Sequence, residues 1–188
     1  TYPLVVEIER SDLSWENSNK FQLFSVGEII PARAVDRLSL NVNNNYPYLY
    51  DFFEEDIAKA DISIGLLENP LQGDPTPCTG CTLFVGDARN AEGLAQVGFD
   101  VLSLAGNHAG DGGQAALGNT IDLLTEQNVK TAGAGSNVDE SLQPAVVEIN
   151  GVKVGLIAAD DIASFYWTND TTEGYGINSF SSEENGVN

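Results

Sequence analysis

Short apolar runs alternate with amphipathic segments along most of this chain. The amphipathic segments carry hydrophobic residues every three or four positions, which is typical of a helix with one buried face, whereas runs of four to eight apolar residues are typical of buried strands. The pattern predicts strands over residues 21–26, 62–67, 82–85, 99–104 and 129–135, and helices over residues 48–60, 88–97 and 114–128. Strands and helices in this order predict a layered α/β fold.

A late hairpin makes the predicted sheet a mixed one. Residues 145–149 and 152–158 are apolar runs separated by Asn150-Gly151, the dipeptide preferred in two-residue hairpin turns. Asp87 is expected to cap the helix that follows it, and Gly98 to end that helix. We therefore predict an N-terminal extension over residues 1–20, a domain over residues 21–161 and an irregular C-terminal segment over residues 162–188.

Polar side chains follow three of the predicted strands. Glu28 and Glu68 come after the first two, and Asn107-His108 comes after the strand that ends at Leu104. Open α/β sheets bind ligands at the carboxyl ends of their strands, and carboxylates that converge there repel one another unless a cation lies between them. These residues therefore predict a site for a divalent cation such as Mn²⁺ or Mg²⁺. The alternative is that each is a solvated residue of a loop or a turn.

Composition narrows the classes of function. The chain has 28 acidic and 8 basic side chains, a net charge of −20, so no basic surface is expected for nucleic acid. Hydrophobic residues make up 42% of the chain, which is typical of a globular protein. Without an apolar run of about 18 residues, no membrane span is expected.

Two further features suggest export from the cell. The chain begins at Thr1 and has no methionine; a removed secretory signal would explain this, as would a cut from a precursor or an incomplete sequence. Cys78 and Cys81 form a single CxxC, whereas a zinc site would need a second pair. We favour a small local disulfide in a protein found outside the cell or at its surface.

Four motifs in order resemble the CapA-like family of poly-γ-glutamate capsule biosynthesis proteins. Residues 27–33, GEIIPAR, resemble the family's GDxMxxR motif, and residues 60–71, ADISIGLLENPL, resemble ADxxxxNLExPL. Residues 98–113, GFDVLSLAGNHAGDGG, are similar to the GFDVxSLANNHxxDxG signature, and residues 150–155, NGVKVG, recur at a family-like spacing. Together with Thr120, Leu124, Gly133-Ala134-Gly135 and Pro144, the resemblance covers about residues 21–160.

This resemblance implies a fold like that of the calcineurin-like metallophosphoesterases, a layered sheet sandwich flanked by helices with a metal site at the strand ends. It implies that Glu28, Glu68 and Asn107 bind Mn, Zn, Fe or Mg. His108 would donate a proton or bind the substrate anion, and Asp111 would orient its imidazole. Arg33 would bind a substrate anion, which for this family is a polyanionic polymer or a small ester.

The chain departs from the family pattern at several positions. Glu28 replaces an aspartate, Leu66 the asparagine of NLE, and Gly106 the first asparagine of NNH. His108 is the only histidine, so the family's later histidine motifs are missing, and the family domain continues past Asp161. We expect a second chain or segment to complete the domain. Two classes of function stay open: a metal-dependent hydrolase, and a non-enzymatic surface or assembly subunit.

Overall fold

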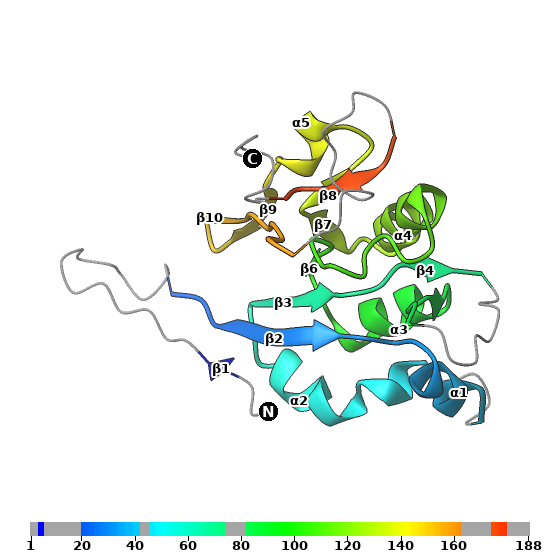
Figure 1. The fold of residues 1–188 in the computed structure, drawn as a ribbon. Helices are drawn as coiled ribbons and strands as arrows, with labels where there is room; N and C mark the ends of the chain where they lie inside the picture. Colours follow the sequence, from blue (N-terminus) through cyan, green and yellow to red (C-terminus); the bar gives the residue numbers. More distant parts are fainter. Residues whose placement is uncertain (1–3, 6–19, 42–45, 74–81, 163–173, 180–188) are drawn as a thin grey trace.

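A mixed five-stranded sheet forms the centre of the protein (Figure 1). The structure is a computed structural model that describes residues 4–5, 20–41, 46–73, 82–162 and 174–179. The strand order is β1 (Leu4–Val5), β2 (Leu23–Ile29), β3 (Ile62–Leu67), β6 (Val101–Ser103) and β7 (Lys130–Ala132). Strands β2, β3, β6 and β7 run parallel, and β1 pairs antiparallel with β2.

The two faces of the sheet bury different layers, because successive side chains of a strand point to opposite faces. Phe24 and Leu102 belong to a core that includes residues of α3 (Asn90–Val97) and α4 (Gln114–Glu126). Val101 and Ile62 belong to a second core, against the hairpin of β9 (Ala145–Ile149) and β10 (Val152–Leu156). The predicted fold class, α/β with a mixed sheet flanked by helices, is therefore confirmed.

Smaller elements complete the described part of the chain. They are α1 (Ala34–Asn41), η2 (Pro47–Leu49), η3 (Asp51–Phe53), α2 (Glu54–Ile57), β4 (Leu71–Gln72), β5 (Gly86–Asp87), β8 (Ala134–Gly135), α5 (Val138–Ser141) and β11 (Gly176–Ile177). Strand β4 pairs in parallel with β5, and β8 pairs antiparallel with β11. The predicted hairpin is confirmed: β9 and β10 pair from Ala145 to Leu156, and Asn150 and Gly151 both adopt positive φ in its turn, the backbone of a type I′ turn.

Two predicted elements are wrong. The helix expected over residues 48–60 is instead η2, η3 and α2 in succession. There Tyr50 is buried and donates a hydrogen bond to Asn90, while the Phe53 ring packs 6.3 Å from that of Phe24, so aromatic packing prevails over helical spacing. Residues 82–85 form no strand, because the Phe84 N–H donates to the side chain of Asp111 rather than to a neighbouring strand.

The parallel strands bring their carboxyl ends to one edge of the sheet. Glu28 pairs with Leu66 across β2 and β3, and Leu66 pairs in turn with Ser103 of β6. This register places Glu28, Glu68 and the turn after β6 at the carboxyl ends of three adjacent strands. Among the helices that the structure describes, none is both long and apolar enough to cross a membrane.

Candidate functional site

Glu68, directly after β3, is the buried carboxylate of this edge. Its side chain is 3% exposed, and Oε1 accepts a hydrogen bond from the backbone N–H of His108 at 3.3 Å. Burial raises the pKa of Glu68, the His108 N–H lowers it, and the nearby charges of Glu28 and Asp160 raise it again. A buried carboxylate beside two others is destabilising unless a cation or a proton compensates it.

Gly106 makes room for this carboxylate. A Cβ at position 106 would lie 2.5 Å from Oε2 of Glu68, closer than atoms can approach without a shift. Glycine in place of the family's first asparagine therefore leaves space for the Glu68 carboxylate. The Glu68 carboxylate lies against the turn after β6, and a larger residue at position 106 would displace it.

The His108 imidazole contacts the carboxylate of Asp111, the partner that the family resemblance implies for it. Nδ1 of His108 lies 2.7 Å from Oδ2 of Asp111, and the same oxygen accepts the Phe84 N–H at 2.6 Å. Since a carboxylate only accepts, we assign the proton of this bond to Nδ1, which leaves Nε2 for proton transfer or ligand binding. The His108 side chain is 28% exposed and that of Asp111 10%, so solvent reaches the imidazole more readily than its partner.

Arg33 joins the same group of residues from the loop after β2. Its guanidinium carbon lies 3.7 Å from the centroid of the Phe84 ring, and Nε donates to the carbonyl of Leu83 at 3.1 Å. The backbone of Arg33 has a φ of 57°, a left-handed conformation that is uncommon in residues other than glycine. Arg33, the predicted anion-binding residue, therefore contacts the same aromatic ring as the His108 imidazole does.

Glu28 and Asn107 are placed less closely. Glu28 lies within β2 rather than after it, beyond a shift of register between Ser25 and Glu28, and its side chain is exposed. Its charge nevertheless acts on Glu68. Asn107 is exposed on the turn between Gly106 and His108. The structure thus brings together Glu68, His108, Asp111 and Arg33 and leaves Glu28 and Asn107 at the rim.

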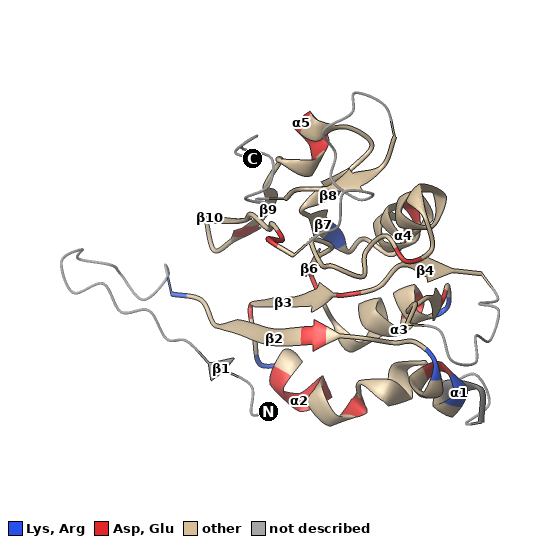
Figure 2. Ribbon diagram, in the orientation of Figure 1, with Lys and Arg blue, Asp and Glu red and all other residues tan. Residues whose placement is uncertain are grey.

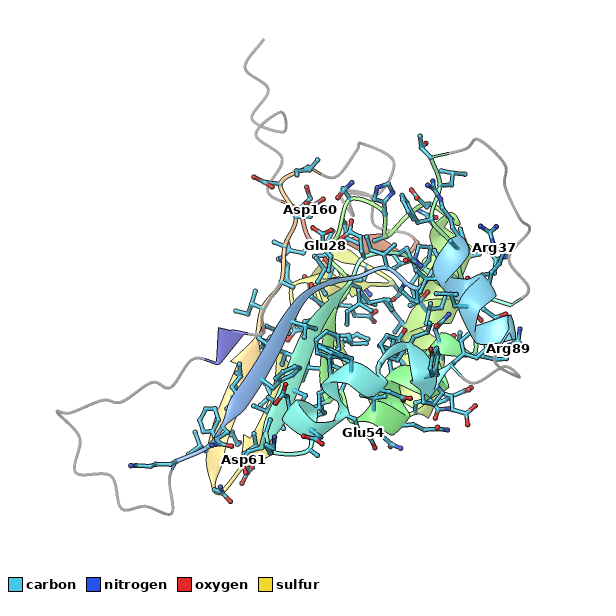
Figure 3. All side chains as sticks on the ribbon, turned by 90° about the horizontal axis from the view of Figure 1, so that it is seen from below. Glu28, Arg37, Glu54, Asp61, Arg89 and Asp160 are labelled. Carbon is cyan, nitrogen blue, oxygen red and sulfur yellow. The ribbon has the colours of Figure 1, made fainter. Side chains whose placement is uncertain are left out.

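Asp160 is a site residue that the sequence analysis missed. It is 9% exposed; Oδ1 accepts the N–H of Ile162 at 3.1 Å, while Oδ2 is buried with no hydrogen-bond partner. Its backbone N–H donates to Asn178, whose own N–H donates to Gly133 just after β7. Figure 3 places Asp160 at the same end of the molecule as Glu28, away from Glu54 and Asp61. The apolar run before Asp160 is the signal that could have found it, since the same signal identified Glu68.

The donor chemistry of this edge fits a hard divalent cation. It consists of the Glu68, Glu28 and Asp160 carboxylates, one of them with an unpartnered buried oxygen, and oxygen donors are what Mg²⁺ and Mn²⁺ prefer. In the parts of the chain that the structure describes, no three or more His, Cys, Asp or Glu side chains are gathered tightly enough for a metal ion. A cation held at this edge would therefore keep most of its waters and bind one or two carboxylates, as Mg²⁺ commonly does.

The cysteine prediction is not tested. Cys78 and Cys81 lie outside the described residues, so a disulfide between them stays a prediction. The domain boundaries at residues 20 and 161 also stay predictions.

The fold and the site together define the class of the protein. It is an α/β protein whose parallel strands direct acidic residues and an imidazole–carboxylate pair to one edge of the sheet, a layout consistent with a metallophosphoesterase-like fold. The model of one family, Bacterial capsule synthesis protein PGA_cap, matches residues 22–186, so the chain belongs to this family and has a role related to capsule synthesis. The resemblance seen in the four motifs is thereby confirmed. A search of curated proteins finds no match.

Proposed function

We propose that this protein is an exported, divalent-cation-dependent hydrolase that cleaves ester or γ-glutamyl bonds of an anionic surface polymer during capsule synthesis or processing. One observation carries the proposal: the buried Glu68 carboxylate accepts the backbone N–H of His108, whose imidazole is held by Asp111. A buried acidic group and an oriented imidazole at adjacent strand ends are what cation-assisted hydrolysis needs.

Each residue then has a distinct role. Glu68 would hold the cation, with Glu28, Asp160 and Asn107 as further oxygen donors. A bound divalent cation (Mn, Zn, Fe or Mg) supplies a Lewis acid and lowers the pKa of a coordinated water. His108 would move a proton at Nε2, Asp111 would keep the ring in place, and Arg33 would bind an oxyanion of the substrate.

The net charge of the chain also bears on the cation. A protein of charge −20 repels a polyanion, and bound or screening cations would reduce that repulsion. The cation would therefore serve both the chemistry and the approach of the substrate. A second chain or segment would supply further ligands around Glu28 and Asp160.

The alternative function is a non-enzymatic surface or assembly subunit that keeps the family fold. It is favoured by Leu66 in place of the asparagine of NLE, by Glu28 in place of an aspartate, and by the single histidine. Under this alternative, Glu68 would bind no cation and replacing His108 would change only stability.

Calorimetric titration with MnCl₂ distinguishes the two functions, together with the metal content of protein purified without chelator. We expect about one equivalent of cation, lost in Glu68→Gln and retained in Glu126→Gln, which changes an exposed carboxylate on α4 in the same way. Phosphoester and γ-glutamyl substrates would then be hydrolysed by the loaded protein. Equal or absent cation binding in the wild type and Glu68→Gln would contradict the proposal and favour the alternative.

A further inference from the structure

Phe84 contacts three of the residues assigned to the site, although the sequence analysis gave it no role. Its ring lies 4.6 Å from that of His108, centroid to centroid, in an edge-to-face arrangement of 73°. The Arg33 guanidinium carbon lies 3.7 Å from the same centroid. The Phe84 N–H donates to the Asp111 oxygen that also contacts His108. Phe84 therefore contacts both side chains that we place on the substrate anion, Arg33 and His108, and also contacts Asp111.

These contacts place an upper limit on the spacing between the guanidinium and the imidazole. Because both distances start at the same centroid, the guanidinium carbon can lie no farther from the imidazole centroid than 3.7 and 4.6 Å added together. A phosphoryl or carboxylate group that accepts from one residue on each side spans a separation of this order. Because the Nδ1–H of His108 donates to Asp111, His108 donates to such a group from Nε2 in its doubly protonated form. A separation within this limit is compatible with one oxyanion that contacts both Arg33 and His108.

Phe84 suits this role by the chemistry of its ring. The face of an aromatic ring attracts a cation, and edge-to-face contact is a preferred geometry for two rings. The ring contact therefore orients the flexible Arg33 side chain and adds no negative charge of its own beside it. The hydrogen bond from Arg33 to the carbonyl of the preceding Leu83 fixes the guanidinium on the same segment.

We propose that Phe84 is a positioning residue that holds Arg33 and His108 on a single oxyanion, a phosphoryl or carboxylate group of the substrate. This inference rests on the proposed function for the roles of Arg33 and His108. It adds that the anion-binding pair is assembled by residues 83–84, outside the motifs that identified the family. Loss of the ring weakens anion binding even though every charged group remains.

Inorganic phosphate is the probe, and the imidazole resonances of the protein report its binding. His108 is the only histidine of the chain, so its ring signals in an NMR spectrum are assigned without ambiguity. At constant pH and ionic strength, phosphate is expected to shift them saturably in the wild type. Phe84→Leu should weaken phosphate binding about two- to fivefold, the range of an exposed cation–π contact, and Phe84→Tyr should restore it.

Phe52→Leu is the matched control, because Phe52 is an exposed phenylalanine that also makes an edge-to-face contact, with Phe53 at 5.5 Å. It should bind phosphate like the wild type. Arg33→Lys keeps Phe84 and the charge but loses the planar contact with the ring, and should also weaken binding, which keeps the test informative if Phe84→Leu does not fold.

Phosphate affinity in Phe84→Leu and Arg33→Lys equal to that in Phe52→Leu would overturn the inference. So would a wild type whose imidazole signals show no saturable shift. Neither result bears on cation binding at Glu68, which MnCl₂ titration measures separately. Failure of the inference is thus distinguishable from failure of the proposed function.

Discussion

At the scale of single residues, we expect Glu68 to lower the stability of the fold and to bind the proposed cation. Its buried carboxylate accepts one backbone hydrogen bond and experiences the charges of Glu28 and Asp160. Glu68→Gln keeps an acceptor for the His108 N–H and removes the charge. We expect the free energy of unfolding at pH 7, measured by urea denaturation without divalent cations, to rise by about 1 kcal/mol.

The exposed Glu126→Gln serves as control and should change stability by less than about 0.5 kcal/mol. A Glu68→Gln protein that is less stable than the wild type would show that the carboxylate is stabilising in its present surroundings. It would then be a structural residue rather than one kept for cation binding.

Replacing His108 or Asp111 should distinguish effects on activity from effects on stability. His108→Ala is expected to lower hydrolysis by about 10²- to 10⁴-fold, the contribution of a positioned proton-transfer group, with little change in stability because the ring is partly exposed. Asp111→Asn should lower both, since one oxygen of Asp111 accepts from His108 and from the Phe84 backbone. Rates from the cation-loaded protein and urea midpoints test this; equal rates in His108→Ala and the wild type would leave the imidazole without a role in catalysis.

At the scale of elements, α1 is joined to β5 and α3 by a buried carboxylate. Asp36 accepts the Asp87 N–H at 3.0 Å and the Asn90 side chain at 2.7 Å. Burial raises the pKa of Asp36 to about 6, although both hydrogen bonds lower it. The folded protein therefore holds this proton more tightly than the unfolded chain, and the stability it contributes is complete below about pH 4 and lost as the pH rises to about 6.

We accordingly expect the wild type to lose about 2 kcal/mol relative to Asp36→Asn between pH 4 and pH 6.5, as a shift of this size implies. Taking the difference between the two proteins cancels the other titrating groups. Urea denaturation across this range measures it, with Asp122→Asn, an exposed aspartate of α4, as control. A difference that stays constant with pH would show that Asp36 has the same pKa in the folded and unfolded protein.

The elements predicted correctly are those whose conformation depends on residues that are neighbours in the chain. The hairpin turn at Asn150-Gly151 needs two positive φ angles, which these residue types favour, and Gly98 ends α3 with a φ of 108°. Glu68 and His108 were predicted because polar residues after apolar runs mark strand ends, whereas the role of Asp111 was predicted from the resemblance to the CapA-like family. Residues 48–60 and 82–85 were predicted wrongly because their conformations depend on partners distant in the chain, such as Asn90 and Asp111. The role proposed for Phe84 was not predicted for the same reason, because its contacts come from three loops that are distant in the sequence.

At the scale of the whole molecule, acidic residues outnumber basic ones on most of the described elements that carry a charge. Figure 2 shows acidic residues on β2, α2 and α5 and few basic ones, among them those of α1 and its approach. With a net charge of −20, folding brings like charges closer than they are in the unfolded chain, and this repulsion lowers stability. Screening by salt should therefore stabilise the protein, since the Debye length falls to about 8 Å at 0.15 M ionic strength.

Comparison of two salts at one ionic strength separates this general repulsion from a specific cation site. We expect NaCl to raise the Tm by a few degrees, since about 1 kcal/mol corresponds to about 2–4 °C in a chain of this size. MgCl₂ at the same ionic strength should raise it further, because a cation that binds only the folded protein stabilises it by mass action. Thermal unfolding of Glu68→Gln tests the source of the difference: NaCl should act as in the wild type, whereas the extra effect of MgCl₂ should disappear. If that extra effect persists without the Glu68 charge, Mg²⁺ acts on the acidic surface as a whole, and the strand-end carboxylates have no special affinity for it.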